Sequence, residues 1–275
     1  MATEFTVQTG GVTLAGEESG EGPAIVLLHG LTATRRYVVM GSRVLERGGH
    51  RVITYDARGH GQSSGAPTSS AYSYGDLAQD LEAVMDDRGV DRAVLAGASM
   101  GAHTLLRFAL HHPERAAGLV VITPAYSGPA GIDQGRFARR DAMAAGLREG
   151  GIEGFIEAYG DPGVGSKQLS DTVLTVMRQR LALHAHPEAL ADALQAVTRS
   201  APFGEIAELG GLKMPMAVVG SNDTADPDHP FAVAQAYAAA IPGAELISDL
   251  PGSSPVAWQG SQLSRVIAEV AARAA

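Results

Sequence analysis

One serine lies between two glycines in the segment Gly97-Ala98-Ser99-Met100-Gly101, a spacing typical of a nucleophile at a sharp turn. An apolar stretch over residues 93–96 precedes the segment, and a helical pattern over residues 101–111 follows it. A tight turn from strand to helix needs small residues two positions on either side of the serine. Such a turn lifts the Ser99 hydroxyl off the sheet and points a helix N-terminus at it, which stabilises negative charge on a substrate oxygen. We interpret Ser99 as a nucleophile, with a purely structural turn as the alternative.

A second chemical signal is the turn His29-Gly30-Leu31, which directly follows a continuous apolar segment. The turn leaves the Leu31 N–H free to face a pocket beside the N–H of Met100. Two backbone donors that converge in this way form an oxyanion hole, which binds the charge that develops on a carbonyl oxygen. We interpret His29 as a turn residue rather than as a base, and we expect His29 and Gly30 to border the substrate.

Short apolar segments alternate with longer amphipathic ones, and this order predicts the elements that position Ser99. Two short strands around Gly10-Gly11 form a hairpin. Later segments are nearly continuous in apolar residues, which favours a parallel sheet buried on both faces. They cover residues 24–28, 51–55, 93–96, 119–122 and 216–219. Helical patterns lie between them, so the predicted fold class is α/β and doubly wound.

Residues 128–208 break this alternation, because they contain helical patterns and no convincing strand. We predict a helical cap over residues 128–208, inserted into a core formed by residues 1–127 and 209–275. A cap at this point lies over the C-terminal edge of the sheet, where open α/β sheets bind ligands. The segment is rich in Ala, Leu and Ile, which predicts a small and largely apolar substrate.

Composition argues against several classes of protein. The chain of 275 residues has no cysteine, which excludes a thiolate nucleophile, a disulfide scaffold and cysteine-ligated metal centres. Its net charge of −9 argues against nucleic-acid binding. There is no signal-peptide pattern and no apolar stretch long enough to span a membrane, so we expect a cytoplasmic protein.

The same reading bears on cofactors and partners. The sequence contains no phosphate-binding loop, dinucleotide fingerprint or metal-ligand cluster, so we expect no cofactor and no metal. The expected partner is a small-molecule substrate, with neither nucleic acid nor membrane. The sequence leaves the oligomeric state open.

The His29-Gly30 turn, the segment Asp56-Ala57-Arg58-Gly59-His60-Gly61 and the serine turn together resemble the α/β-hydrolase superfamily in their order and separation. The resemblance extends from about residue 4 to residue 272. It implies Ser99 as the nucleophile, with Leu31 and Met100 as oxyanion donors. Members of this superfamily that open epoxides or haloalkanes carry Asp at the position that Ser99 occupies in this chain.

The superfamily also implies a position for the catalytic acid. That residue follows the first strand after the cap, in a Gly-x-x-Asp pattern that Gly220-Ser221-Asn222-Asp223 matches here. The resemblance therefore implies Asp223 as the acid. Asp226 and Asp228 lie close by, and an acidic loop without a role is the competing interpretation of these two residues.

The base departs from the superfamily pattern. Relatives carry a histidine in the loop after the last strand, typically as Pro-Gly-x-Gly-His, whereas the loop after residues 244–248 reads Pro251-Gly252-Ser253-Ser254-Pro255. Serine is only weakly nucleophilic near neutral pH without a base. His229, in the loop of the implied acid, is our candidate replacement. A solvated residue at a helix entry is the alternative.

The remaining candidate residues have structural interpretations beside the functional ones. Tyr126, Pro255 and Trp258 are expected to border the substrate. His184 and His186, in the predicted cap, are interpreted as residues of a solvated helix end rather than as a second candidate base. His60 and His103 are expected to pack the scaffold. Four arginines are expected to be solvated; they are Arg35, Arg36, Arg139 and Arg140.

Three functions follow from this reading. The first is a serine hydrolase that acts on an ester, a lactone or a related acyl group through Ser99 with a displaced base. The second is a non-hydrolytic cyclase or lyase of a biosynthetic pathway on the same scaffold, in which backbone donors stabilise an enolate or oxyanion. The third is a ligand-binding protein without turnover.

Overall fold

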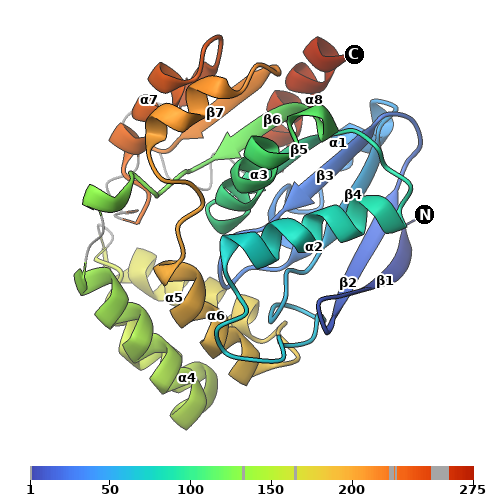
Figure 1. Ribbon diagram of the computed structural model, residues 1–275. Helices are drawn as coiled ribbons and strands as arrows, with labels where there is room; N and C mark the ends of the chain where they lie inside the picture. Colours follow the sequence, from blue (N-terminus) through green and yellow to red (C-terminus); the bar gives the residue numbers. More distant parts are fainter. Residues whose placement is uncertain (1, 132–133, 164–165, 223–225, 227, 249–259) are drawn as a thin grey trace.

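The computed structural model describes every residue except 1, 132–133, 164–165, 223–225, 227 and 249–259. Its strands form one sheet in the order β1-β2-β4-β3-β5-β6-β7-β8 (Figure 1). The strands are β1 (Thr3–Thr9), β2 (Val12–Ser19), β3 (Ala24–Leu28), β4 (Arg51–Tyr55), β5 (Ala93–Ala98), β6 (Ala116–Ile122), β7 (Met216–Gly220) and β8 (Glu245–Ser248). β2 pairs antiparallel with β1 and β4, and every other pair is parallel.

The antiparallel hairpin and the parallel strands agree with the predicted α/β fold class. β1 and β2 meet at Gly10 and Gly11, whose φ angles of 52° and 77° are ones that L side chains rarely adopt. In the parallel strands, successive side chains point to opposite faces of the sheet, so a continuous apolar run is buried on both sides. Val26 of β3, for example, belongs to the core on one face and Leu27 to the core on the other.

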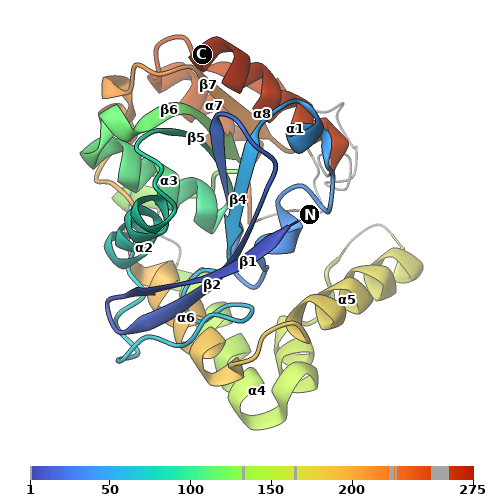
Figure 2. The ribbon, with the colours of Figure 1, turned by 90° about the vertical axis from the view of Figure 1, so that its right-hand side faces the viewer.

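Helices cover both faces of the sheet. One face packs against α2 (Tyr74–Asp87), α3 (Met100–His111) and α7 (Phe231–Ala240), and the other against α1 (Val44–Arg47) and α8 (Ser261–Ala274). Figure 2 shows the sheet between these two layers. Helix α2 begins with a capping box, in which the side chains of Ser73 and Asp76 each accept the backbone N–H of the other residue.

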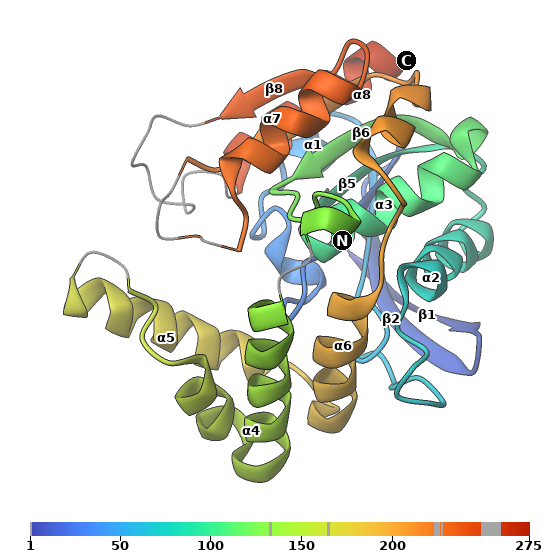
Figure 3. The same ribbon diagram turned by 60° about the vertical axis from the view of Figure 1, so that its left-hand side comes forward.

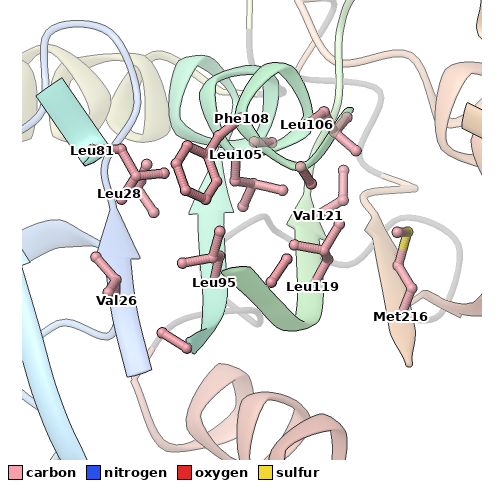
Figure 4. Packing of buried hydrophobic residues seen from close by; sticks show 14 of the residues in the cluster. Val26, Leu28, Leu81, Leu95, Leu105, Leu106, Phe108, Leu119, Val121 and Met216 are labelled. Atoms are coloured by element: carbon pink, nitrogen blue, oxygen red, sulfur yellow. The ribbon is translucent and has the colours of Figure 1, made fainter. Parts of the chain in front are cut away.

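The core under α3 fixes the position of the serine turn. Side chains of β3, β5 and β6 interlock with Leu105, Leu106 and Phe108 of α3 (Figure 4). All three α3 side chains are buried, with exposed fractions of 1% or less. Since each such side chain contributes about 1.5–3 kcal/mol by leaving water, α3 is held firmly against the strand that precedes it.

In the described part of the chain, three α-helices lie between β6 and β7, within the region predicted as a cap. They are α4 (Gln134–Tyr159), α5 (Lys167–Leu181) and α6 (Pro187–Arg199). Gly151 interrupts α4 with a φ of 60° and a ψ of −144°, which divides it into two helical pieces. Figure 3 shows these three helices gathered at one end of the sheet, and below we call them the insertion helices.

Polar contacts join the insertion to the loops at the C-terminal ends of the strands. Arg180 of α5 donates to the Thr32 hydroxyl over 2.6 Å, and the Ala185 N–H donates to the Gly61 carbonyl over 2.8 Å. Tyr74, at the start of α2, donates its N–H to the Ser200 hydroxyl. The insertion therefore covers the edge of the sheet that carries Ser99. No helix in the part of the chain that the structure describes is both long and apolar enough to cross a membrane.

Candidate active site

Ser99 lies in a strained turn between β5 and α3. Its backbone has a φ of 50° and a ψ of −108°, which non-glycine residues rarely adopt. A Cβ on Gly97 would collide with the backbone of Gly101, and a Cβ on Gly101 would collide with the Leu28 carbonyl. Both glycines are therefore required by the close approach of β3, β5 and α3. Strain of this kind persists where the surrounding fold enforces it, as the buried helix α3 does here.

His229 contacts Ser99 directly. The Ser99 hydroxyl lies 2.8 Å from Nε2 of His229, and Nδ1 of the same ring lies 2.8 and 2.9 Å from the two carboxylate oxygens of Asp226. With the Nδ1–H donating to Asp226, Nε2 is the acceptor that faces the serine. The three side chains form a hydrogen-bonded relay in which imidazole can take the serine proton and the carboxylate orients the ring.

The histidine and the carboxylate of the relay both come from the segment between β7 and α7. The His229 N–H approaches the Asp226 carbonyl over 3.3 Å, and this turn holds the two side chains on the same side. Pro230 follows at once and precedes α7. The side chains of His229 and Asp226 are 20% and 22% exposed, so solvent and a substrate can reach the relay.

The structure changes the interpretation of the acidic loop. Asp226, for which an acidic loop without a role was the competing interpretation, is the carboxylate that contacts His229. Asp223, implied as the acid by the superfamily pattern, lies outside the described residues. Asp228 faces Arg140, whose guanidinium donates to it over 2.7 Å. Sequence reasoning missed Asp226 because only a fold decides which of three neighbouring acids turns toward His229.

The candidate oxyanion donors Leu31 and Met100 belong to two segments that lie next to Ser99. Met100 is the first residue of α3, where backbone N–H groups have no partner within the helix. Leu31 follows Gly30. An added Cβ at Gly30 would lie 3.5 Å from the Ser99 Cβ, so this loop passes directly beside the turn that carries Ser99. Neither amide has a hydrogen-bond acceptor among the residues that the structure describes. Two such donors are suited to bind an oxyanion.

His29 has no free ring nitrogen for a substrate. Its Nδ1 donates to the Gly30 carbonyl over 2.8 Å, and its Nε2 accepts the Ala57 N–H over 2.9 Å. The side chain is 2% exposed, and burial lowers its pKa. The ring therefore connects the loop of residues 29–32, called the oxyanion loop below, to the loop after β4, which agrees with its interpretation as a turn residue.

Three further histidines are buried in the scaffold. His184 was interpreted as part of a solvated helix end, which is wrong: it is 8% exposed, accepts the Gly61 N–H and donates to the Thr32 carbonyl. His60 donates from Nδ1 to the Arg58 carbonyl. His103 accepts the N–H groups of residues 125 and 126 at Nε2 and shares a hydrogen bond with the Tyr74 hydroxyl. These rings hold loops together and do not face Ser99.

Burial lowers the pKa of all these buried imidazoles, to about 4 for His184 and about 3 for His103. An unfolded histidine binds a proton near pH 6.5, so below that pH the unfolded chain binds more protons than the folded one. Stability is therefore fully present above pH 6.5 and is lost as the pH falls toward 4. We expect the free energy of unfolding, measured with urea, to fall by up to about 1.4 kcal/mol per pH unit for each such histidine.

His184→Gln is a matched variant for this expectation. Glutamine can accept the Gly61 N–H and donate to the Thr32 carbonyl, but it does not titrate. The variant should show a shallower loss of stability between pH 6.5 and 4.5 than the wild type. A wild-type protein of equal stability at pH 7 and pH 5 would contradict the assignment of buried neutral histidines.

Other predicted substrate contacts have mixed outcomes. Tyr126 lies beside His103, and its hydroxyl is 3.5 Å from the Gly204 carbonyl. Gly30 lies against the elbow, as described above. Pro255 and Trp258 lie outside the described residues, as does the rest of the loop in which the superfamily carries its histidine.

One arginine of each pair expected to be solvated is largely buried, while Arg36 and Arg139 are exposed as expected. Arg35 is 9% exposed and donates to the Asp56 carboxylate over 2.5 Å. The Arg140 side chain is 14% exposed and contacts Asp228. Apolar patterning did not predict either residue as buried, because each is neutralised by an acid from a distant segment. Among the described residues, no group of three or more His, Asp or Glu side chains is arranged to hold a metal ion.

Comparison with known proteins shows which fold this chain shares with them. A sequence model described as the alpha/beta hydrolase fold matches residues 23–144. The chain is 39% identical over 101 residues to a mouse sn-1-specific diacylglycerol lipase, a match that covers 36% of this chain and 32% of the lipase. Its structure superimposes on a thermophilic esterase from Thermogutta terrifontis, solved with malate bound, with a TM-score of 0.78 and 25% identity over 98% and 97% of the two chains. The chain has the α/β-hydrolase fold and is similar to members of that superfamily.

Further α/β hydrolases resemble parts or all of the chain. Epoxide hydrolase B of Mycobacterium tuberculosis is 35% identical over 108 residues, which cover 39% of this chain and 30% of that protein. The chain thus spans about a third of the length of these curated relatives. A solved structure of Est816, described as degrading N-acyl homoserine lactones, gives a TM-score of 0.72 at 25% identity over 97% and 99% of the two chains.

Proposed function

We propose that this α/β hydrolase cleaves a carboxylic ester, a lactone or a related acyl bond of a small substrate, with Ser99 as nucleophile and His229 as base. The observation that carries the proposal is the 2.8 Å contact between the Ser99 hydroxyl and Nε2 of His229. Asp226 would hold the ring in the tautomer that accepts the serine proton. The amides of Leu31 and Met100 would bind the oxyanion.

The relay supports a two-step acyl transfer. Ser99 Oγ attacks the carbonyl carbon while its proton passes to Nε2 of His229, and the carbonyl oxygen becomes an oxyanion between the two amides. The C–O bond of the ester then breaks, and the leaving alkoxide takes the proton from Nε2. Water attacks the acyl-serine in the same way, giving its proton to His229, and collapse releases the acid and restores the Ser99 hydroxyl.

The same geometry favours hydrolysis over the two alternatives. A ligand-binding protein needs a pocket, but it does not need an imidazole hydrogen-bonded to a serine on one side and a carboxylate on the other. A cyclase or lyase that relies on backbone donors does not need the serine to contact a base. Both alternatives predict activity or binding that is independent of the Ser99 hydroxyl.

Turnover of short p-nitrophenyl esters tests the proposal. We expect the wild-type protein to release p-nitrophenol from the acetate and butyrate esters at neutral pH, and Ser99→Ala to remain at the rate of the buffer. Acetyl and butyryl adducts on Ser99, trapped by acid quenching and found by mass spectrometry, are the expected intermediates. A wild-type rate equal to that of Ser99→Ala would overturn the proposal.

A further inference from the structure

Two arginines of the insertion helices lack the carboxylate partner that the other arginines there possess. Arg139 and Arg140 face Asp228, and each of the others forms an ion pair with an acid; these are Arg148, Arg178 and Arg199 with Asp192, Glu153 and Asp141. Arg136 and Arg180 have no ion pair with any carboxylate in the described part of the chain. The Nε atoms of both are buried and have no hydrogen-bond partner there.

Arg180 is fixed beside the oxyanion loop. One terminal nitrogen of its guanidinium donates to the Thr32 hydroxyl over 2.6 Å, and Thr32 directly follows Leu31. The guanidinium carbon lies 5.9 Å from the centre of the Tyr37 ring. Burial lowers the pKa of Arg180, and the positive charge of Arg140 acts in the same direction. This cation therefore has a hydroxyl and an aromatic ring as neighbours, and no ion pair with any carboxylate among the described residues.

Arg136 lies on α4, one helical turn before Arg140. Burial lowers the pKa of His103, one helical turn after Ser99, and the charge of Arg136 lowers it further. Although burial acts in the opposite direction, the charges of Arg140 and Arg136 lower the pKa of Asp228, the neighbour of His229. Since Arg140, one helical turn later on α4, contacts Asp228 beside His229, Arg136 lies on the part of α4 that is next to this segment.

Two acids of the segment before α7 that the structure describes are already engaged. Asp228 binds Arg140 over 2.7 Å and Asp226 binds His229. Burying a guanidinium without a partner is costly, and its planar fork of N–H donors fits a carboxylate better than any other common group. The whole chain carries a net charge of −9, so a general basic composition does not explain two unbalanced cations at this place.

We propose that the substrate carries a free carboxylate besides its ester or lactone bond, and that Arg180, assisted by Arg136, binds this carboxylate beside Ser99. This inference rests on the proposed function for the position of the bond that is cleaved. It replaces the expectation of a largely apolar substrate, because apolar residues of the insertion form a core of their own between α4, α5 and α6. The two arginines would bind the carboxylate of an acid ester, and the carbonyl group of its ester bond would then lie beside Ser99.

Paired esters that differ only in charge test this inference. The monomethyl esters of succinate, glutarate and adipate each carry one carboxylate, and the corresponding dimethyl esters carry none. We expect the wild-type protein to hydrolyse at least one monomethyl ester with a kcat/KM about tenfold or more above that of its dimethyl ester. Arg180→Gln should lower kcat/KM for that monomethyl ester about 10- to 100-fold, mainly through KM, and should lower kcat/KM for the dimethyl ester much less.

Matched variants separate recognition from folding. Arg178→Gln removes an exposed arginine two residues earlier on the same helix and should leave both esters unchanged. Arg180→Lys keeps the charge but loses the planar fork, so it should lose less than Arg180→Gln. Arg136→Gln should lower kcat/KM for the monomethyl ester while sparing the dimethyl ester. Equal activity of the wild type on all charged and neutral pairs, or equal losses on both in Arg180→Gln, would overturn the inference.

Calorimetry on Ser99→Ala distinguishes this inference from the proposed function, because binding needs no turnover. We expect the monomethyl ester to bind Ser99→Ala and to lose this binding when Arg180 is also changed to Gln. Such binding combined with a wild-type protein that cleaves no ester would support the carboxylate site and overturn the hydrolase. Cleavage of neutral esters without any binding preference for the acid would support the hydrolase and overturn the carboxylate site.

Discussion

Replacing His229 by alanine is expected to lower kcat/KM for p-nitrophenyl butyrate about ten-thousand-fold or more, and Ser99→Ala to lower it about as much. The serine hydroxyl lies 2.8 Å from the imidazole, and the two act as one unit: without the base the hydroxyl stays protonated, and without the hydroxyl the base has nothing to activate. The double variant should therefore be no slower than either single variant. Initial rates of p-nitrophenol release measure all three.

His184→Ala is not a suitable control for this prediction, because it removes a buried ring that joins two loops. His111→Ala is suitable, since that residue lies exposed at the end of α3. It should retain wild-type turnover. The His229 side chain is 20% exposed, so its removal should shift the melting temperature by only a few degrees at most. Near-normal turnover in a folded His229→Ala variant would contradict the role of His229.

Asp226→Asn is expected to lower kcat/KM about 10²- to 10⁴-fold. The carboxylate accepts the Nδ1–H of His229, which leaves Nε2 free to accept the serine proton. An asparagine amide can donate to Nδ1 instead, and the ring proton then lies on Nε2, where it blocks the transfer. The loss should therefore appear mainly in kcat, and it should be seen with neutral and acidic esters alike.

Asp223→Asn is the matched variant for Asp226→Asn. The superfamily pattern in the sequence implies Asp223 as the acid, whereas the contacts of His229 lead to Asp226. We expect Asp223→Asn to retain most of the wild-type activity. A larger loss in Asp223→Asn than in Asp226→Asn would restore the sequence-based assignment and contradict ours.

The fold was predictable because its signals are local. The glycines around Ser99, the apolar parallel strands and the strand-free region 128–208 each follow from short-range steric and hydrophobic rules. The roles of Ser99 and of the Leu31 and Met100 amides rest on the same local patterns and stay predictions. The division of the chain into a core and a cap at residues 128 and 208 stays a prediction, although α4, α5 and α6 lie within those bounds.

The polar partners were not predictable in the same way. Asp226 and His229 are three residues apart, and only the turn between them brings the carboxylate to Nδ1. Arg140 and Asp228 are 88 residues apart, and Arg180 and Thr32 are 148 apart. A sequence pattern cannot indicate which acid, if any, will neutralise a given arginine. This is why buried arginines near the serine were first expected to be solvated.

Activation of Ser99 by His229 is the central claim about this site. The rate of covalent labelling measures this activation without any substrate. The wild type and His229→Ala would each be mixed with a fluorophosphonate, quenched at successive times, digested and analysed by mass spectrometry. We predict a phosphonyl adduct on Ser99 that forms about 100-fold or more slowly in His229→Ala. Equal labelling rates in the two proteins, or an adduct on another residue, would contradict the account.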